Sequence, residues 1–218
     1  MNTQEQARFN MVEQQIRPWQ VLDKAALNVL SHLPRELFVP QAYQALAYTD
    51  TEVPLANGHS MLPPRVDARL MHDLELTGTE KVLVIGVGSG YLCALIAGRA
   101  QRVIGLESDS ELAATARDNL QRAGVTNVDV RLADGSQGAA GDAPFDAIVL
   151  GGSVAEVPQA LLKQLKVGGR LMAIVGQDPV MCATLFTRTG DAAWSSKALW
   201  DTTAPRLQGF TEPSRFQF

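Results

Sequence analysis

The sequence predicts an α/β protein with a Rossmann-like, doubly wound sheet of about seven mostly parallel strands, helices on both faces and an N-terminal helical lobe. The first observation behind this is the unbroken apolar run at residues 82–85, which is typical of a parallel strand buried on both faces. The second is a group of glycines that follows this run and precedes a helical stretch at residues 91–97. The third is another apolar run, residues 103–106, which ends in Glu107. This order of elements indicates a β-α-β unit that binds a ligand.

The rest of the sheet is predicted from the segments after Glu107. Strand character is found at residues 128–132, 145–150, 170–175, 181–188 and 193–200. We expect the last two to be antiparallel strands that complete the sheet. A helix is predicted at residues 111–123, with Asp109 or Ser110 as its N-cap, and another at residues 158–165.

The sequence after residue 165 gives weaker signals. Gly168 and Gly169 are expected to form a turn before the strand at residues 170–175. Three phenylalanines mark an apolar tail that we expect to pack back on the domain. They are Phe210, Phe216 and Phe218.

The N-terminal part is predicted to be helical. A helix is expected at residues 4–15, broken near Pro18, and Asp23 is well placed to cap a second helix. The apolar contacts of the first helix are expected to be Ala7, Phe9 and Val12. We therefore expect a helical lobe with a substrate loop at residues 1–78, packed as one structural unit on a ligand-binding domain at residues 79–218.

The composition argues against several classes of protein. With 218 residues, 46% of them hydrophobic, the chain can build one domain with a sizeable core. Its net charge is −4 without a basic run, so we expect no nucleic-acid partner. We also expect no signal peptide and no membrane span, and Cys93 and Cys182 as buried thiols in a reducing cytoplasm. His32, His59 and His72 lack ligand spacing, so we expect no metal site. The sequence does not indicate an oligomeric state.

The glycine turn indicates which ligand the β-α-β unit binds. Gly86, Gly88, Ser89 and Gly90 precede the predicted helix, so bare backbone and the helix N-terminus face the ligand. Glu107 follows the first glycine by about twenty residues, the spacing of an acid that accepts ribose hydroxyls. A dinucleotide fingerprint would need glycine at position 91, where this chain has tyrosine, so a nicotinamide-dependent oxidoreductase is a disfavoured alternative. The pattern resembles instead the S-adenosylmethionine loop of class I methyltransferases.

Three segments near the N-terminus make the resemblance more specific. They are Met-Val-Glu-Gln-Gln-Ile at 11–16, Leu-Pro-Arg-Glu-Leu-Phe-Val-Pro at 33–40 and Ala-Tyr-Thr-Asp at 47–50. In this order and spacing they look like the N-terminal lobe of the protein-L-isoaspartate O-methyltransferase family, and the likeness continues through residues 143–149 and 157–171. The resemblance implies S-adenosyl-L-methionine as the cofactor and isoaspartyl residues of damaged proteins as the substrate. It also implies that Asp134 and Gly135, after the third strand, contact the adenine.

The expected substrate loop departs from the family pattern. That family has Gly-Gln-Thr-Ile-Ser-x-Pro before its sheet, where this chain has Gly-His-Ser-Met-Leu-Pro-Pro at residues 58–64. Leu62 therefore replaces the serine that is given the active-site role in the family. Ser60 is the nearest remaining hydroxyl and our candidate catalytic residue, with a loop serine bonded to its own backbone as the alternative. Gly-Gly-Ser at residues 151–153 likewise replaces the family's Thr-Ala-Ala.

The chemistry of carboxylate methylation shows what this departure affects. The cofactor supplies an activated methyl group, and a carboxylate with a pKa of about 4 is ionised at neutral pH, so no general base is needed. The protein aligns oxygen, methyl carbon and sulfur and excludes water. We therefore predict an S-adenosylmethionine-dependent carboxyl O-methyltransferase with a protein or peptide substrate. The alternative is a cofactor-binding relative with a different acceptor or a regulatory role, without isoaspartyl activity because of Leu62.

Overall fold

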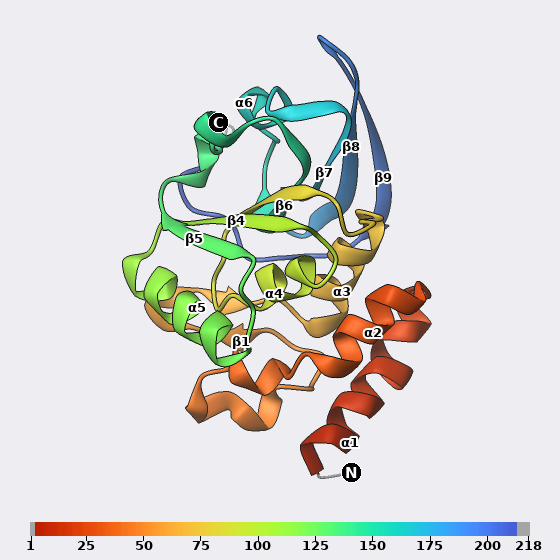
Figure 1. Ribbon diagram of the computed structural model, residues 1–218, viewed down its shortest axis with the longest axis vertical. Coiled ribbons are helices and arrows are strands. Elements are labelled where there is room, and N and C mark those ends of the chain that lie inside the picture. Colours follow the sequence, from red (N-terminus) through yellow and green to blue (C-terminus); the bar gives the residue numbers. More distant parts are fainter. Residues whose placement is uncertain (1–2, 213–218) are drawn as a thin grey trace, which may run out of the picture.

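The computed structural model describes residues 3–212 and has a central sheet of seven strands (Figure 1). The strands are β3 (Lys81–Ile85), β4 (Arg102–Glu107), β5 (Val128–Leu132), β6 (Phe145–Val154), β7 (Leu165–Gln177), β8 (Val180–Gly190) and β9 (Ala193–Asp201). Their order is β5-β4-β3-β6-β7-β8-β9, parallel from β5 to β7 and antiparallel at β8 and β9. The chain thus winds outward from the centre in both directions, which confirms the predicted doubly wound fold.

Helices cover both faces of this sheet. They are α1 (Thr3–Asn10), α2 (Lys24–His32), α3 (Pro64–Asp73), α4 (Tyr91–Ala97), α5 (Ser110–Arg122) and α6 (Gln159–Leu162). Figure 1 shows α3, α4 and α5 on one face and α6 on the other. Short 3-10 turns lie at Arg35–Leu37, Gln41–Leu46, Ala56–Gly58, Gly135–Gln137 and Ala140–Asp142, and a two-stranded ribbon is formed by β1 (Val53–Pro54) and β2 (Ser60–Met61).

The central strand β3 divides its side chains between two hydrophobic cores. Val82 and Val84 belong to a core shared with α2, α3 and α4. Leu83 and Ile85 belong to a second core, which includes the leucines of α6. Alternate side chains of a strand face opposite sides of the sheet. The unbroken apolar run in the sequence therefore corresponds to a strand that is covered on both faces.

The first helix differs from its prediction. α1 continues directly as a π-helical turn, Met11–Ile16. Such a turn is closed by hydrogen bonds from i to i+5, so it shifts the side chains that face inward. Met11, Val12 and Ile16 are buried, whereas Phe9 is 50% exposed, and the expectation that Phe9 packs inward is wrong.

Two helix starts agree with the sequence. The Asp23 carboxylate caps α2 by accepting hydrogen bonds from the Ala25 and Ala26 amides at 2.6 and 3.2 Å. Asp109 caps α5 in the same way, with N···O distances of 2.8 and 3.0 Å to two first-turn amides. These caps satisfy backbone donors that a helix leaves unpaired at its start.

After β6, the helix is shorter and the next strand is longer than the sequence predicted. The helix expected at residues 158–165 spans only α6, because Leu165 already begins β7. Gly168 and Gly169 lie inside β7 and do not form a separate turn. The register against β6 shifts between Phe145 and Ala147, so the extra residues are accommodated as an irregularity of the strand pair.

The N-terminal segment contacts the last strand, β9, through two tryptophans. Trp19 and Trp200 lie edge to face, with 6.4 Å between ring centroids. Trp200 Nε1 donates a hydrogen bond to Asp73 at 2.7 Å, and the guanidinium groups of Arg65 and Arg69 lie over the two rings. Such contacts add stabilisation beyond the burial of apolar area.

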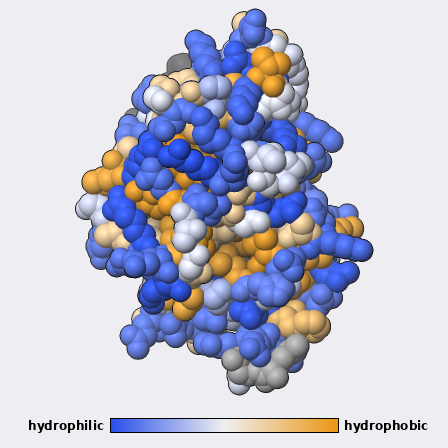
Figure 2. Space-filling view, viewed as in Figure 1, coloured by the Kyte–Doolittle hydropathy of each residue, from blue (hydrophilic) through white to orange (hydrophobic). Residues whose placement is uncertain are grey.

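The surface and the thiols give further constraints. Figure 2 shows hydrophilic side chains over most of one face, with apolar ones gathered across its middle.

Within residues 3–212, no helix is long and apolar enough to cross a membrane, and no group of three His, Cys, Asp or Glu side chains is placed to hold a metal ion. Cys93 is buried as expected, whereas Cys182, on a strand next to the sheet edge, is only half-buried.

Candidate functional site

Three glycines shape the turn after β3. The φ angles of Gly86, Gly88 and Gly90 are +80°, +56° and +92°, a region that residues with side chains rarely adopt. Gly90 is also the N-cap residue of α4, so the first amides of that helix face the turn. The turn lies where the strand order reverses between β3 and β6, the place at which open α/β sheets bind ligands.

Glu107 connects the end of β4 to this turn. One carboxylate oxygen accepts a hydrogen bond from the Gly88 amide at 2.8 Å, and the other accepts one from the Asp109 amide at 3.0 Å. The residue is only 4% exposed. Each carboxylate oxygen can accept a second hydrogen bond. Glu107 can therefore still receive two hydroxyl groups, as a ribose presents them.

Asp134 and Gly135 follow the end of β5. The Asp134 carboxylate accepts hydrogen bonds from the amide and the hydroxyl of Ser136 at 2.9 and 3.0 Å, which caps the short 3-10 turn there. Gly135 lines the crevice beside β3. A Cβ atom at this position would clash with Ile85 Cγ2, so only glycine fits.

Ser89 is hydrogen-bonded to a side chain of α5. Its carbonyl oxygen accepts a hydrogen bond from Asn119 Nδ2 at 2.9 Å, and both residues are 4% exposed. Ser89 lines a small cavity next to Tyr91 that adjoins the glycine turn. Sequence reasoning missed Asn119. The sequence feature that could have indicated its role is a polar amide side chain on the apolar face of a predicted helix, one turn after Ala116.

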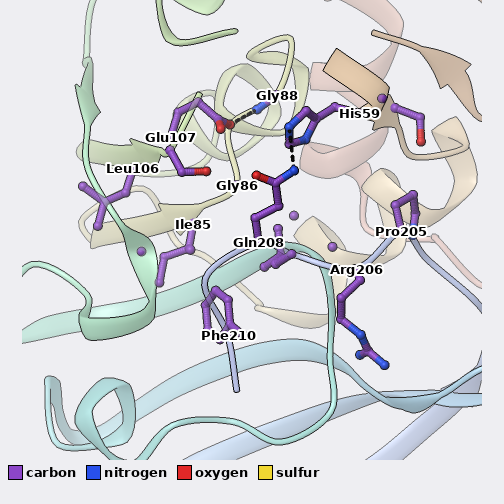
Figure 3. Close-up of a pocket in the computed structure, with 17 residues that line it drawn as sticks. His59, Ile85, Gly86, Gly88, Leu106, Glu107, Pro205, Arg206, Gln208 and Phe210 are labelled. Atoms are coloured by element: carbon purple, nitrogen blue, oxygen red, sulfur yellow. Dashed lines mark hydrogen bonds between the residues drawn. The ribbon is translucent and has the colours of Figure 1, made fainter. Parts of the chain in front are cut away.

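A crevice of about 100 Å³ brings most of the predicted residues together at the carboxyl edge of the sheet (Figure 3). Of the predicted cofactor-binding residues, Gly86, Gly88, Glu107 and Gly135 line it. Ser60, the predicted catalytic residue, lines it as well and comes from the small ribbon of β1 and β2. The structure therefore places these four residues and Ser60 around one space, whereas the predicted residues Ser89, Gly90 and Asp134 do not line it.

The glycines at the end of β6 are required by close contacts. A Cβ atom on Gly151 would clash with the carbonyl oxygen of Gly86, so the two backbones touch across the switch point. A Cβ atom on Gly152 would lie 2.8 Å from the carbonyl oxygen of Pro205. The Gly-Gly-Ser segment thus lets the turn after β3 and the C-terminal part of the chain approach β6.

The substrate loop presents one hydroxyl group. Ser60 Oγ donates a hydrogen bond to Glu52 Oε2 at 2.9 Å, so this serine is bonded across the ribbon and not to its own backbone. Leu62 is 3% exposed and packs in the core. Its carbonyl oxygen accepts a hydrogen bond from Arg35 Nη2 at 2.7 Å. At position 62 only the backbone carbonyl is available as a polar acceptor, and it already has Arg35 as its hydrogen-bond partner.

A buried ion pair supports this loop from below. Arg35 is fully buried, donates to Asp67 at 3.0 Å and stacks on the Tyr91 ring, with 4.4 Å between Cζ and the ring centroid. Burial raises the pKa of Asp67 to about 6, although Arg35 acts in the opposite direction. The pair links the substrate loop to the helix that follows the glycine turn. Sequence reasoning missed it; the signal was an arginine within the apolar segment at residues 33–40.

The C-terminal strap, which we define as residues 203–210, crosses the end of β6. The Ser153 amide donates to Pro205 O at 2.8 Å, the Leu207 amide donates to Ser153 O at 2.9 Å, and Ser153 Oγ donates to Ala204 O at 2.8 Å. Phe210 packs against the second core, as predicted for the apolar tail, whereas Phe216 and Phe218 lie outside the described residues.

A wider groove opens beside the crevice. It encloses about 950 Å³, and the two spaces share Gly58, Ser60, Pro205 and Arg206 as lining residues. Ser60 therefore stands between a narrow space beside the glycine turn and a broad, open one. An extended polypeptide could reach the crevice through this groove.

Comparison with known proteins identifies the family. The family model described as protein-L-isoaspartate(D-aspartate) O-methyltransferase (PCMT) matches residues 6–203. A protein-L-isoaspartate O-methyltransferase of Methanoculleus marisnigri is 43% identical over 169 residues, which cover 78% of this chain and 77% of the relative. The chain belongs to this family. Its prediction as an S-adenosylmethionine-dependent carboxyl methyltransferase is thereby confirmed.

Two solved structures of the family show the same fold. One named protein-L-isoaspartate O-methyltransferase superposes with a TM-score of 0.82 at 24% identity and covers 93% of this chain, which spans 66% of that longer chain. A second, described as a putative member from Plasmodium falciparum in complex with S-adenosyl-L-homocysteine, has a TM-score of 0.77 at 21% identity and covers 95% of this chain and 99% of its own. These likenesses confirm the fold.

The residues around the crevice fit the adenosyl cofactor of the family. Bare backbone at Gly86 and Gly88 admits close approach, and the buried Glu107 carboxylate keeps free lone pairs at the end of the neighbouring strand. A Cβ atom on Gly86 would clash with Leu207 Cδ2. A side chain of the C-terminal strap therefore lies in the space next to the glycine turn.

Proposed function

We propose that this chain transfers the methyl group of S-adenosyl-L-methionine to a carboxylate on a protein or peptide, with isoaspartyl residues as the acceptor. The observation that carries this proposal is the position of Ser60, between the glycine-lined crevice and the wider groove. A cofactor at the glycine turn and a polypeptide in the groove would meet at this residue. The names of the relatives support isoaspartyl residues as the acceptor class.

The proposed cofactor site is formed by the predicted residues, each with its own part. Glu107 would receive the ribose hydroxyls, and the three glycines of the turn would lie against the methionine portion. Asp134 and Gly135 would contact the adenine. The full set is Gly86, Gly88, Ser89, Gly90, Glu107, Asp134 and Gly135. When bound, the cofactor supplies the activated methyl group.

The side chains of the protein would align the acceptor and exclude water. A carboxylate acceptor is ionised at neutral pH, so the site needs no residue that removes a proton. The Ser60 hydroxyl now donates to Glu52 and could instead donate to an acceptor oxygen. Leu62 offers no side-chain donor at the position where the family has its serine. In this proposal Ser60 orients the acceptor.

A transfer assay with a matched pair of peptides tests this proposal. One peptide contains an isoaspartyl residue and the other an aspartyl residue in the same sequence. We expect radiolabel from the methyl group of the cofactor to appear on the isoaspartyl peptide alone and to be released by mild base. If neither peptide is labelled while S-adenosylhomocysteine binds in calorimetry, the isoaspartyl acceptor is wrong and the cofactor assignment stands.

A second candidate function is favoured by Leu62. Its side chain is packed in the core, so the family's serine hydroxyl has no substitute at that position. The chain would then be a cofactor-binding relative with another acceptor or a regulatory role. Leu62→Ser discriminates between the two functions, with Leu62→Ala as the control that removes the same apolar contacts without adding a hydroxyl. Activity on the isoaspartyl peptide in the serine variant alone would support this second function.

The proposal also covers the two parts of the chain, its partners and its cellular compartment. Residues 1–78 would act as a lobe that presents the acceptor to a cofactor domain at residues 79–218. Its partners would be protein or peptide substrates in the cytoplasm, without nucleic acid or membrane. One of the two hydrophobic cores contains side chains from both parts, which supports a single structural unit.

A further inference from the structure

We propose that the C-terminal strap closes the cofactor crevice, that Leu207 is the plug, and that the strap lifts when S-adenosyl-L-methionine binds. This inference rests on the proposed cofactor site. It adds a conformational step that involves residues outside the glycine turn and Glu107.

The Leu207 side chain lies against the glycines at the ends of β3 and β6. Leu207 Cδ2 occupies the place that a Cβ atom on Gly86 would need, and it lies 2.9 Å from the place of a Cβ atom on Gly152. The bare faces of these two glycines are the surfaces that a ligand at the turn would contact. A leucine methyl group and a cofactor atom cannot both occupy this space. Cofactor binding at the turn therefore requires Leu207 to move.

The volume of the crevice leads to the same conclusion. With the strap in place the crevice encloses about 100 Å³. Pockets that bury small-molecule ligands and cofactors typically enclose about 300–1,000 Å³. Leu207, Gln208 and Phe210 of the strap all line the crevice. Figure 3 shows Gln208 and Phe210 beside it. Displacement of the strap would enlarge this space without a change in the sheet.

The strap is attached in a way that allows it to lift. Its backbone is bonded to β6 through Ser153, by a single parallel bridge to Arg206. Two side-chain hydrogen bonds add to this bridge, from the Ser153 hydroxyl to Ala204 O and from Arg206 Nη2 to Gly176 O. Within the strap only Ala204 is buried, and its other residues are half-buried or exposed. Segments with few buried contacts and few backbone hydrogen bonds open at low free-energy cost. The strap can thus detach while β6 keeps its pairing with β3 and β7.

A contact between side chains couples the strap to the substrate loop. Gln208 Nε2 donates to His59 Nε2 at 3.3 Å, and Figure 3 shows the two side chains meeting over the crevice. His59 directly precedes Ser60. Lifting of the strap would break this contact and free the loop next to the proposed acceptor position. Cofactor entry would in this way precede and permit acceptor binding.

Calorimetry and stopped-flow binding of S-adenosylhomocysteine test the plug. Leu207→Ala should lower the Kd at least fivefold and raise the association rate, because the smaller side chain leaves the turn open. Leu22→Ala, at a leucine that is 61% exposed on the lobe, is the matched control and should change neither value. An unchanged or weaker affinity of Leu207→Ala overturns the proposal. Gln208→Ala should raise the association rate as well, since it removes the contact with His59 and leaves the glycine turn intact.

Hydrogen exchange supplies a readout that does not depend on a variant. The amides of Ser153 and Leu207 are bonded between β6 and the strap. On addition of S-adenosylhomocysteine to the wild-type chain they should exchange faster, while the Gly88 amide exchanges more slowly. Slower or unchanged exchange at both strap amides overturns the plug and leaves the cofactor site standing. No binding to either the wild type or Leu207→Ala overturns the cofactor site and the plug together.

Discussion

The Gly88 amide donates a hydrogen bond to the Glu107 carboxylate at 2.8 Å, which joins the first glycine turn to the end of the adjacent strand. The contact fixes a bare backbone turn and a carboxylate in one orientation. A ligand that contacts both needs no rearrangement of either group, and such preorganisation lowers the cost of binding.

Glu107→Gln should weaken the binding of S-adenosylhomocysteine by one to two orders of magnitude. A charge-assisted hydrogen bond contributes about 1.5–3 kcal/mol, and each 1.4 kcal/mol corresponds to about a tenfold change in affinity. Glutamine keeps the shape and one acceptor oxygen, but its NH2 group faces the backbone amide of either Gly88 or Asp109, so part of the loss comes from this broken contact. Calorimetry gives the Kd, and circular dichroism controls for folding. An affinity equal to that of the wild type would show that Glu107 does not receive the ribose.

Gly151→Ala should abolish cofactor binding and lower the free energy of unfolding by about 1–3 kcal/mol, the usual cost of overpacking. The new methyl group would clash with the backbone carbonyl of Gly86, which cannot rotate away as a side chain could. Gly141→Ala is the matched control, since no atom lies within 4 Å of its Cβ position. Urea unfolding and calorimetry measure the two effects. Equal behaviour of both variants would contradict the contact.

Ser60→Ala should raise the KM for an acceptor peptide and leave the Kd for S-adenosylhomocysteine unchanged. The hydroxyl group is placed toward the groove, whereas the cofactor contacts come from the strand ends. Ser196→Ala, at an exposed serine of β9, serves as the control. Steady-state kinetics with variable peptide and fixed cofactor separate the two constants. If the Kd for S-adenosylhomocysteine rises while the KM for the peptide stays the same, Ser60 belongs to the cofactor site and not to the acceptor site.

Arg35→Met and Asp67→Leu should each destabilise the protein by about 3–5 kcal/mol, because each leaves a buried charge without its partner. The double variant should cost less than the sum of the two single variants. A double-mutant cycle from urea unfolding gives this coupling, which we expect to exceed about 1 kcal/mol. Additive losses would show that Arg35 acts mainly through Leu62 and Tyr91 and not through Asp67.

The same pair gives a pH dependence of stability. Burial raises the pKa of Asp67 from 3.8 to about 6 in the folded state, so the folded protein holds this proton more tightly than the unfolded chain does. The stabilisation from this group is complete below about pH 4 and is lost as the pH rises through 6, by up to about 3 kcal/mol. Asp67→Asn does not titrate. The stability of the wild type relative to this variant should therefore fall between pH 4 and pH 7, and a rise would contradict the raised pKa.

The cofactor side of the site could be read from the sequence because its signals are local. The glycines, the helix that follows them and Glu107 lie within one short β-α-β unit, where spacing alone determines position. Helix caps such as Asp23 and Asp109 are also local, since the side chain bonds to amides two and three residues later. The fold class followed from the alternation of predicted strands and helices, whereas the order of the strands in the sheet was not predicted and is given by the structure.

The features that the sequence did not predict depend on distant contacts or on local irregularities. Arg35 and Asp67 are 32 residues apart, and Leu207 reaches Gly86 from the other end of the chain. No periodic pattern links such residues. Phe9 was misplaced because the π-helical turn after α1 breaks the regular helical period on which the prediction relied.

The contact of Trp19 with Trp200 gives the chain a built-in optical reporter. Two of its three tryptophans sit where the lobe meets the last strand, and the third, Trp194, donates to the Leu162 carbonyl at 3.1 Å on the other side of the sheet. Movement of the lobe would change the emission of the first pair, while general loss of structure would change all three. Fluorescence of the unlabelled protein can thus show whether the contact between Trp19 and Trp200 changes during turnover.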